Sequence, residues 1–554
     1  MSRQHASFCS SRAVSSIGAY ALLLGYFLTG CGDVGIDGDP QPPNVGETGY
    51  VVGAVQGLDY QTDSMLGVTG PRGEFSYEEG ERVRFFLGSA YLGETEGKSE
   101  VTVFDIAGIE PITNGWRGAD EAGSAFKRAV NMLVAFETFD YDGDPDNGIE
   151  IGAEVTEAFG LADVNLDAHA WGFRRDPRFR GVLNELNDRG LLADHRAPRG
   201  PAPALNRLYD LLGIESGLFA NQTYSEDLGN DGVIDETYYS EYDADGFRTY
   251  TRQTSAFHDQ HQSWFESNDW GQHTRATTDD YSDGSIDSIS TYEFDEDGNS
   301  VRIERDTDND GRPDYIQVRE YDAFGRETRA WTDQNADGRW ESVSEAVYDD
   351  EARTVLRSED SNADGVTDTT NLVFFTLDGQ RRRRVSDSNG DGIADRISEW
   401  EYDERGNQSV HYSDSNGDGS WDRIIEYEHD ARGRQIRFAE DRGGDGTVDY
   451  VTTQTFDAEG RRLRWEADRG ADGSIDEVRW HEYVDDRLVA YGVTLHSIFE
   501  DDNADGVIDY ATYEYLDAHG ELVRREQDHS GDGVIDVAYE YTKVAVGWGN
   551  YFSD

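Results

Sequence analysis

A nine-residue phrase, D-x-[N/D/G]-x-D-G-x-x-D, returns every 27 residues along much of the chain and constrains its fold more than any other feature. It occurs in eleven intact copies, with one decayed unit between the first two. The first aspartates of the copies are Asp227, Asp279, Asp306, Asp333, Asp360, Asp387, Asp414, Asp441, Asp468, Asp501 and Asp528. A fixed period of this length predicts an array in which each unit packs on its neighbours.

The phrase places oxygen ligands at regular points of a tight turn. Calcium is a hard cation that binds six to eight oxygen atoms, which carboxylate and amide side chains supply in calcium loops. Position 6 is glycine in every copy, and glycine readily adopts the positive φ that lets a chain wrap around an ion. Asp, Asn and Gly are also common turn formers, but a turn alone does not require carboxylates at positions 1, 5 and 9. The phrase therefore predicts calcium as the bound cofactor.

The predicted ligands are the first, fifth and ninth residues of each loop, and the third residue where it is Asp or Asn. Those at position 5 are Asp231, Asp283, Asp310, Asp337, Asp364, Asp391, Asp418, Asp445, Asp472, Asp505 and Asp532. Those at position 9 are Asp235, Asp287, Asp314, Glu341, Asp368, Asp395, Asp422, Asp449, Asp476, Asp509 and Asp536. Those at position 3 are Asp308, Asn335, Asn362, Asn389, Asn416 and Asn503. Loops with Gly229, Tyr281, Gly443 or Gly470 at position 3 need water or another donor, and Ser530 is a further candidate.

The loops are not EF-hands, because an EF-hand needs a bidentate Glu at position 12 between two helices. Position 12 here is Tyr238, Ser290, Gln317 or another residue, and never Glu. With the closing carboxylate at position 9, the loops resemble those of thrombospondin type 3 repeats and of integrin-type propeller repeats. This resemblance implies calcium coordination within each loop.

A second phrase lies fifteen residues after most loop starts, where an aromatic residue is followed by D-x-x-G, as in Tyr321-Asp322 to Gly325. Asp at the start and Gly at the end favour a tight turn. The stretches on either side are rich in β-branched and aromatic residues and predict strands. Each unit is therefore a β-hairpin with a calcium loop at one end and a D-x-x-G turn at the other. The aromatic-Asp phrase resembles the YD repeats of Rhs and teneurin proteins, without their full consensus.

Twelve such hairpins predict roughly twenty-four strands, and open sheets rarely exceed about ten strands without curling. The predicted fold class is therefore mainly β, a repetitive array of calcium-loop hairpins in an antiparallel meander that coils, rolls up or closes. A six-bladed propeller built from pairs of hairpins would need an alternation at twice the repeat length, which the sequence lacks.

The chain is strongly acidic, with 113 acidic and 49 basic residues and a formal net charge of −64. The carboxylates of the predicted loops account for about half of this net charge, and the remainder is typical of a solvated surface. Because nucleic acid carries a dense negative charge, it is not an expected partner.

The N-terminus predicts a lipoprotein signal. Arg3 and Arg12 precede an apolar run from about Ile17 to Leu28, which ends in Leu28-Thr29-Gly30-Cys31. A charged start and a short apolar core indicate a secretory signal over residues 1–30, and its end resembles the bacterial lipobox. The resemblance implies cleavage before Cys31 and a membrane anchor through an acylated Cys31. It also implies a cell-envelope location, at the outer membrane and facing the periplasm or the cell surface.

Three regions precede the array of residues 221–554. Residues 31–47 are rich in Gly, Asp and Pro and predict a tether. Residues 48–105 show short β-like runs and resemble a small β-domain found at the front of proteobacterial lipoproteins. Residues 106–220 are mostly helical, since Phe126, Ala129, Leu133 and Phe136 fall at helical spacing. The acidic run from Asp140 to Asn147 is either a further calcium loop or an acidic turn.

The sequence contains no H-E-x-x-H helix, no G-x-S-x-G elbow and no phosphate-binding P-loop. The favoured hypothesis is a non-enzymatic, calcium-binding envelope lipoprotein that acts as a structural, adhesion or binding scaffold, with a surface polymer or a protein as its partner. The alternatives are a secreted carbohydrate-processing enzyme with its site in residues 106–220, and an enclosure similar to a YD shell.

Overall fold

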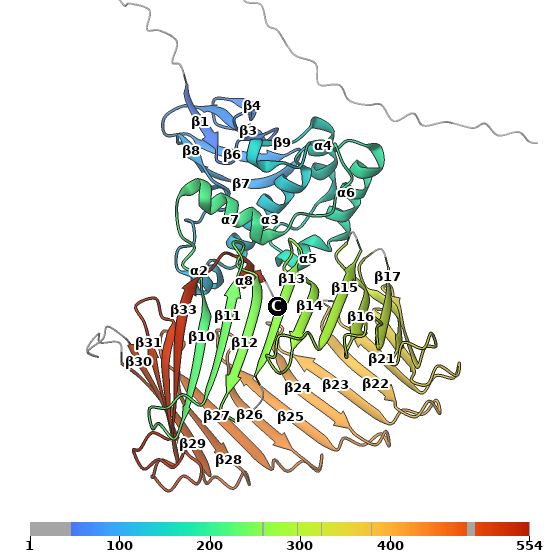
Figure 1. Ribbon diagram of the computed structural model, residues 1–554, viewed down its shortest axis with the longest axis vertical. Coiled ribbons are helices and arrows are strands. Elements are labelled where there is room, and N and C mark those ends of the chain that lie inside the picture. Colours follow the sequence, from blue (N-terminus) through green and yellow to red (C-terminus); the bar gives the residue numbers. More distant parts are fainter. Residues whose placement is uncertain are drawn as a thin grey trace, which may run out of the picture. The chain divides into compact units, whose positions relative to one another are not determined.

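The computed structural model describes residues 46–257, 260–295, 297–322, 324–377, 379–484 and 494–552 (Figure 1). The predicted signal peptide, Cys31 and nearly all of the predicted tether lie outside the described residues. From Gly46 onward the chain forms one compact unit.

The repeats form a single antiparallel sheet of 24 strands that closes into a barrel. Every strand pairs with the strands before and after it in the sequence, and the last strand pairs with the first. The strands are β10 (Phe219–Leu228), β11 (Glu236–Tyr242), β12 (Arg248–Ser255), β13 (His261–Ser267), β14 (His273–Asp279), β15 (Ser288–Phe294), β16 (Ser300–Asp306), β17 (Tyr315–Tyr321), β18 (Glu327–Asp333), β19 (Ser342–Asp349), β20 (Thr354–Asp360), β21 (Thr369–Phe375), β22 (Arg381–Asp387), β23 (Arg396–Tyr402), β24 (Gln408–Asp414), β25 (Arg423–His429), β26 (Gln435–Asp441), β27 (Tyr450–Phe456), β28 (Arg462–Asp468), β29 (Glu477–Val484), β30 (Thr494–Asp501), β31 (Tyr510–Leu516), β32 (Leu522–Asp528) and β33 (Val537–Ala545).

The predicted fold class is confirmed, and closure is the form that the meander takes. At the seam, β10 lies against β33, with Tyr224 opposite Tyr541 and Glu226 opposite Tyr539. A propeller is excluded because all 24 strands are consecutive neighbours in one sheet. Closure pairs both edge strands, so neither end of the array presents an unpaired edge.

The connections of the meander alternate between two rims of the barrel, because neighbouring strands run antiparallel. The eleven D-x-x-x-D-G loops share one rim, here called the loop rim, with the decayed connection between β12 and β13. The D-x-x-G turns lie on the other rim, here called the turn rim. In one of them Gly298 donates its N–H to the Asp295 carbonyl oxygen over 2.9 Å, and the Asp295 side chain accepts the Asn299 N–H over 2.7 Å. Asp and Gly therefore have the turn roles that the sequence predicted.

Neighbouring hairpins are tied by the tyrosine that precedes many of the turns. Tyr321 donates its hydroxyl to the carbonyl oxygen of Ser300, and Tyr402 donates to that of Arg381. In each case the acceptor lies 21 residues upstream, at the start of the strand that precedes the tyrosine's own strand. The same bond recurs from Tyr242, Tyr348 and Tyr483.

Small sheets and helices precede the barrel. The strands are β1 (Glu47–Val51), β2 (Val55–Gln56), β3 (Asp59–Gln61), β4 (Leu66–Val68), β5 (Glu74–Tyr77), β6 (Arg82–Leu87), β7 (Ala90–Glu96), β8 (Glu100–Val101) and β9 (Ile149–Glu150). The helices are α1 (Val103–Ala107), α2 (Gly115–Ala122), α3 (Ser124–Phe139), the 3-10 helix η1 (Pro145–Asn147), α4 (Ala153–Ala162), α5 (Ala170–Arg174), α6 (Pro177–Arg189) and α7 (Pro201–Leu212). After the barrel, α8 (Gly549–Phe552) leaves the array, and Trp548 beside it packs on Phe126 of α3. None of the helices described is both long and apolar enough to cross a membrane.

The hydrophobic core lies in this N-terminal region and not in the barrel. Its members run from Val51 to Leu218, joined by Phe247, Trp548 and Phe552. Most side chains of the barrel strands are only half-buried. Barrels of sixteen or more strands are too wide for their own side chains to fill, which accounts for a barrel without a packed core.

The helical region contacts the turn rim through polar and aromatic groups. Trp270, in the turn between β13 and β14, donates its indole N–H to the Pro198 carbonyl oxygen over 2.8 Å. Asn206 of α7 donates to the Asp245 carbonyl oxygen over 3.0 Å and accepts the Trp548 N–H over 2.8 Å. The helical region therefore covers part of the turn rim and leaves the loop rim uncovered by these contacts.

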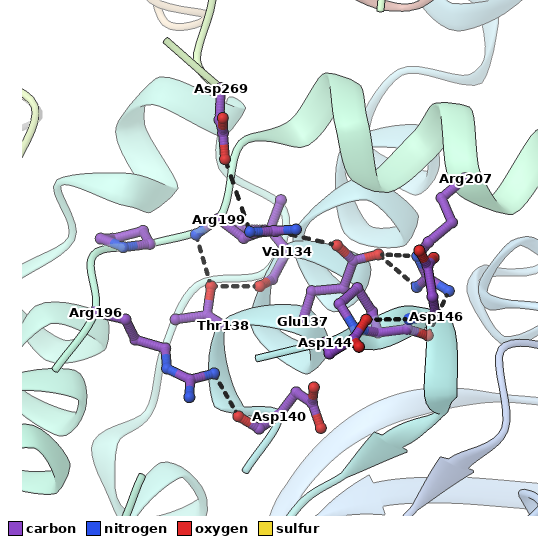
Figure 2. Close-up of polar contacts among 12 residues, drawn as sticks. Val134, Glu137, Thr138, Asp140, Asp144, Asp146, Arg196, Arg199, Arg207 and Asp269 are labelled. Carbon is purple, nitrogen blue, oxygen red and sulfur yellow. Dashed lines mark hydrogen bonds and ion pairs between the residues drawn. The ribbon is translucent and has the colours of Figure 1, made fainter. Parts of the chain in front are cut away.

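A buried carboxylate supports the same contact from within the helical region. Figure 2 shows Glu137 of α3 between Arg207 of α7 and Arg199, which in turn reaches toward Asp269 of the barrel turn. Arg207 donates to Glu137 over 3.0 Å from Nε, and Arg199 lies 3.7 Å from both carboxylates. Burial raises the pKa of the Glu137 carboxyl, and the two arginines oppose this shift.

Candidate metal-binding rim

The predicted ligands of each loop follow directly on a strand of the barrel. Position 1 is the last residue of the preceding strand in all but the first loop, where it is the last but one. Its side chain is buried in nine loops and half-buried at Asp306 and Asp360, although the loops are exposed. Asp279 and Asp414 are 1% exposed and Asp333 is 2% exposed. The strand therefore positions the first carboxylate, and the turn brings the other ligands to it.

The first carboxylate holds the loop backbone in place. In the loop that starts at Asp333, the Asp337 N–H donates to Oδ1 over 3.1 Å and the Gly338 N–H donates to Oδ2 over 2.9 Å. Gly338 has a φ of +87°, a conformation that favours glycine. The bond from the position 6 N–H recurs in all eleven loops. Both oxygens of the position 1 carboxylate thus accept hydrogen bonds from the backbone of the turn. A bound ion would contact the same carboxylate.

The carboxylate at position 9 closes the loop by accepting the N–H of position 2. The distance is 2.6 Å from Gln334 to Glu341 and 2.8 Å from Thr307 to Asp314. Where position 2 is Thr or Ser, its hydroxyl also donates to the carboxylate. These side-chain hydrogen bonds lower the pKa values of Asp314, Asp368, Asp395 and Asp422. The carboxylates are therefore ionised at neutral pH, as a metal ligand must be.

Two loops bring three carboxylates within reach of one ion. Single oxygen atoms of Asp306, Asp308 and Asp314 lie within 4.8 Å of one another, as do those of Asp333, Asp337 and Glu341. Calcium lies about 2.3–2.6 Å from each ligand, so two ligand oxygens can be up to about 5 Å apart. The oxygen atoms present therefore fit calcium in these two loops.

The remaining loops hold the predicted ligands in the same order along the turn. Where position 3 is Asn, its side-chain oxygen accepts the N–H of position 5, as from Asp364 to Asn362 over 2.9 Å. The loops with Gly229, Tyr281, Gly443 or Gly470 at position 3 have no such oxygen from that residue. Calcium remains a prediction for all eleven loops.

Position 4 has a structural role that the sequence analysis missed. It adopts a positive φ in every loop, between +48° and +70°. Seven loops place a non-glycine residue there, and four place glycine. The non-glycine residues are Asn230, Ser282, Asn309, Ala336, Ala363, Ala471 and Ala504, and the glycines are Gly390, Gly417, Gly444 and Gly531. The four glycines were the available signal, since glycine at one loop position in several repeats indicates a left-handed residue.

Position 4 also lies against the neighbouring loop. Asn309 donates its side-chain amide to the carbonyl oxygen of Ile286, position 8 of the preceding loop, over 2.9 Å. At Gly390 a Cβ would collide with the carbonyl oxygen of Thr367, which is position 8 of the loop before it. Adjacent loops are therefore in contact, and a substitution that distorts one loop also perturbs the loop beside it.

The mostly apolar residues at position 8 are exposed or half-buried and do not anchor the loops in a core. Ile234 is 47% exposed, and Trp340 and Ile475 are each 40% exposed. Because the barrel has no packed core beneath this rim, there is no apolar interior for them to enter. The loops are held instead by the hydrogen bonds of positions 1 and 9.

The acidic run in the helical region forms a turn. Asp142 accepts the Asp144 N–H over 3.0 Å and the Asn147 side-chain amide over 2.9 Å, while Asp140 accepts the Glu150 N–H over 2.8 Å. These bonds account for the acidic residues without an ion.

Comparisons with known proteins give no family for this chain. No family model matches it, and no curated protein matches it. Among solved structures, a crystal structure of TcdB2-TccC3-Cdc42 matches at 12% identity and a TM-score of 0.27, over 54% of this chain and 17% of that one. The Photorhabdus luminescens Tc holotoxin pore matches at 12% identity and a TM-score of 0.20, over 55% and 19%. A porin-like protein from Bacteroides uniformis matches at 12% identity and a TM-score of 0.20, over 39% and 92%. The chain spans under a fifth of the matched chains in the first two of these structures, and TM-scores this low support no conclusion about fold or function.

Proposed function

We propose that this chain is a calcium-binding, non-enzymatic scaffold of the cell envelope, in which metal ions stabilise one rim of a closed barrel. One observation carries the proposal: all eleven acidic loops lie on the same rim, and two of them place three carboxylate oxygens within 4.8 Å of one another. Without an ion, these like charges repel one another, which disfavours the folded rim.

Calcium stabilises such a barrel by mass action, since the complete ligand set exists only when the loop is folded. A site that binds the folded chain alone contributes about 2.7 kcal/mol when the free ion is at 100 times its dissociation constant. Many sites on one rim therefore add up to a large dependence on calcium.

Thermal unfolding of residues 46–554 followed by circular dichroism, in calcium and in a calcium chelator, tests the proposal. We expect a lower midpoint and less β-structure in chelator, restored by calcium up to the millimolar range that is usual for extracellular modules. Magnesium should restore little, because it requires near-ideal octahedral geometry. Equal midpoints in calcium and in chelator would refute the proposal.

The envelope location rests on the sequence Leu28-Thr29-Gly30-Cys31 and is tested separately. The exchange Cys31→Ser should move the protein into the soluble fraction and abolish labelling by a fatty-acid analogue. A variant that still fractionates with membranes would refute lipid anchoring and leave the calcium proposal intact.

A second candidate function is enclosure of a cargo, favoured by closure of the barrel and by its lack of a packed core. A wide barrel leaves a lumen, and the helical region covers part of one rim. Protease protection distinguishes the two functions: an enclosed polypeptide co-purifies and resists digestion until calcium is removed, whereas a scaffold carries no protected cargo.

A further inference from the structure

A cavity lies where the seam of the barrel meets the helical region. Its volume is about 710 Å³, within the range of roughly 300–1,000 Å³ that is usual for ligand sites. It is lined from the barrel by strands β10 to β13 and β33, and from outside the barrel by Trp116 of α2 and Asn550 of α8. The cavity shares no residue with the eleven loops.

The lining combines aromatic rings with hydrogen-bonding groups and contains almost no aliphatic side chains. The rings belong to Trp116, Phe219, Tyr224, Tyr238, Tyr242 and His261, and among the described residues of the lining only Ala220 is aliphatic. Between the rings lie Asn221, Ser240, Thr251, Gln253 and Asn550. Flat apolar faces surrounded by amides and hydroxyls match sugar rings, which have apolar C–H faces and an edge of hydroxyl groups. A lipid chain would leave the amides and hydroxyls of the lining without hydrogen bonds.

The charge of the lining contrasts with that of the whole chain. The cavity is lined by Arg248, Arg252 and Lys543 against a single carboxylate, Glu521, in a chain of net charge −64. Lys543 pairs with Glu521 over 3.1 Å. Arg248 lies over the ring of Phe265, and Arg252 lies over that of Tyr239. Among the described residues, neither arginine has a carboxylate partner. Successive side chains of a strand point to opposite faces, so Arg252 points away from the side chains of Thr251 and Gln253. Arg248 is therefore the cation left for a ligand.

Two tyrosines of the cavity depart from the repeat. Tyr238 stands at position 12 of its unit, where the next three intact units have Ser290, Gln317 and Ser344. Tyr224 stands three residues before its loop, where no later intact unit has tyrosine, and its ring lies 5.3 Å from that of Tyr238. Tyrosine recurs at position 12 only as Tyr539 of the last unit, whose ring stacks on that of Tyr224 across the seam. The nine intact units between the first and the last have tyrosine at neither position, so hairpin structure does not explain the pair.

We propose that this cavity binds an acidic oligosaccharide, with the sugar rings against Tyr224 and Tyr238 and a sugar carboxylate near Arg248. A nucleotide would offer a flat ring and negative charge as well. No glycine lines the cavity, however, so it has no glycine-rich backbone cradle of the kind that holds phosphate groups.

Calorimetric titration of residues 46–554 with a uronic-acid oligosaccharide such as oligogalacturonate tests the proposal. The methyl-esterified oligosaccharide and ATP serve as comparison ligands. Free calcium is held constant by a buffer, since uronates bind calcium. We expect binding of the acidic oligosaccharide, weaker binding of the ester, and no competition by ATP.

The variants Tyr238→Ser and Arg248→Gln should each weaken this binding about tenfold or more. Both introduce residues that other units carry at the same position, Ser290 and Gln408, so folding is expected to persist and is checked by circular dichroism. The control Tyr292→Ser replaces a barrel tyrosine outside the cavity with the residue that the first unit carries, Ser240, and should leave binding unchanged.

The absence of binding up to millimolar oligosaccharide would overturn the proposal. So would preferential binding of ATP, or equal weakening by the control. None of these three results bears on the calcium loops, whose test is thermal unfolding without any sugar.

Discussion

Gly229, in the first loop, donates its backbone N–H to the carbonyl oxygen of Asp536, the last residue of the last loop, over 2.6 Å. The two residues lie at opposite ends of the array and meet because β10 pairs with β33. The contact between adjacent loops, seen from Asn309 to Ile286, therefore also exists across the seam. The first and last loops are therefore neighbours on the loop rim, and each stabilises the other as stacked units do.

Removing one carboxylate ligand should abolish binding of one calcium ion and perturb the adjoining loops. We expect Asp391→Ala, at position 5 of its loop, to lower the calcium stoichiometry by about one and to lower the thermal midpoint in calcium, while distant loops stay folded because stacked units contact only their neighbours. Elemental analysis after equilibrium dialysis measures the stoichiometry.

The matched control is Asp502→Ala, which removes an exposed aspartate at position 2, where only the backbone N–H contributes to the loop. It should leave the stoichiometry unchanged. The same loss of calcium in both variants would show that diffuse negative charge, and not a ligand set, holds the ions.

The left-handed residue at position 4 predicts stability changes of opposite sign in neighbouring loops. Ala363 has a φ of +52°, which is unfavourable for a residue with a side chain. We expect Ala363→Gly to raise the free energy of unfolding by about 0.5–1 kcal/mol.

In the next loop, Gly390→Ala should lower the free energy of unfolding by about 1–3 kcal/mol. It imposes a side chain at a φ of +69° and directs its Cβ into the Thr367 carbonyl oxygen. Denaturant unfolding in calcium measures both exchanges, and changes of the same sign would contradict this description of position 4.

We expect the barrel to lose stability in mild acid because of His481, whose pKa is lowered in the folded chain. Burial, together with the nearby His496, lowers the pKa of His481 to about 4. The unfolded chain takes up this proton near the ordinary pKa of about 6.5, so stability falls as the pH drops from about 6.5 to 4. The variant His481→Gln, which carries the residue found at Gln454 one unit earlier, should flatten the decrease of the thermal midpoint over this window in saturating calcium.

The control is His519→Gln, which removes an exposed histidine and shows whether loss of a histidine by itself changes the thermal midpoint.

Glu514, which lies beside His496, affects stability over a lower range of pH. Hydrogen bonds from His496 and Arg525 lower the pKa of Glu514 to about 2, so its contribution is lost between about pH 4.5 and 2. An unaltered slope between pH 6.5 and 4 in His481→Gln would assign the acid sensitivity to other groups.

The buried ion pair of the helical region predicts a large effect far from the loops. Glu137→Gln leaves Arg207 and Arg199 without their buried carboxylate, and we expect a loss of about 3 kcal/mol. Denaturant unfolding followed by tryptophan fluorescence measures it, because Trp270 and Trp548 lie at this contact.

Glu121→Gln is the control, since its pair with Arg117 is exposed and should contribute less than about 1 kcal/mol. Equal effects of the two exchanges would mean that Glu137 is not held by its arginines.

Much of the barrel could be predicted because its information is local and repeated. Asp295 and Gly298 define a turn, and the strands on either side carry a β-type composition, so each hairpin could be predicted from its own residues. The order of ligands from Asp333 to Glu341 was also visible, since the residues of a tight loop are brought together by the chain itself. The positive φ of Ala336 was not visible, because alanine does not indicate that conformation.

The sequence by itself determined the hairpin, the number of strands and the rim on which each acidic loop lies, since all three follow from contacts within one repeat. Only the tertiary structure decided that the meander closes, because closure depends on the summed twist and curvature of 24 strands, to which each repeat adds little. The meeting of Gly229 with Asp536, the covering of one rim by the helical region and the cavity at the seam are consequences of that closure. They join residues from tens to hundreds of positions apart, for which no local pattern exists.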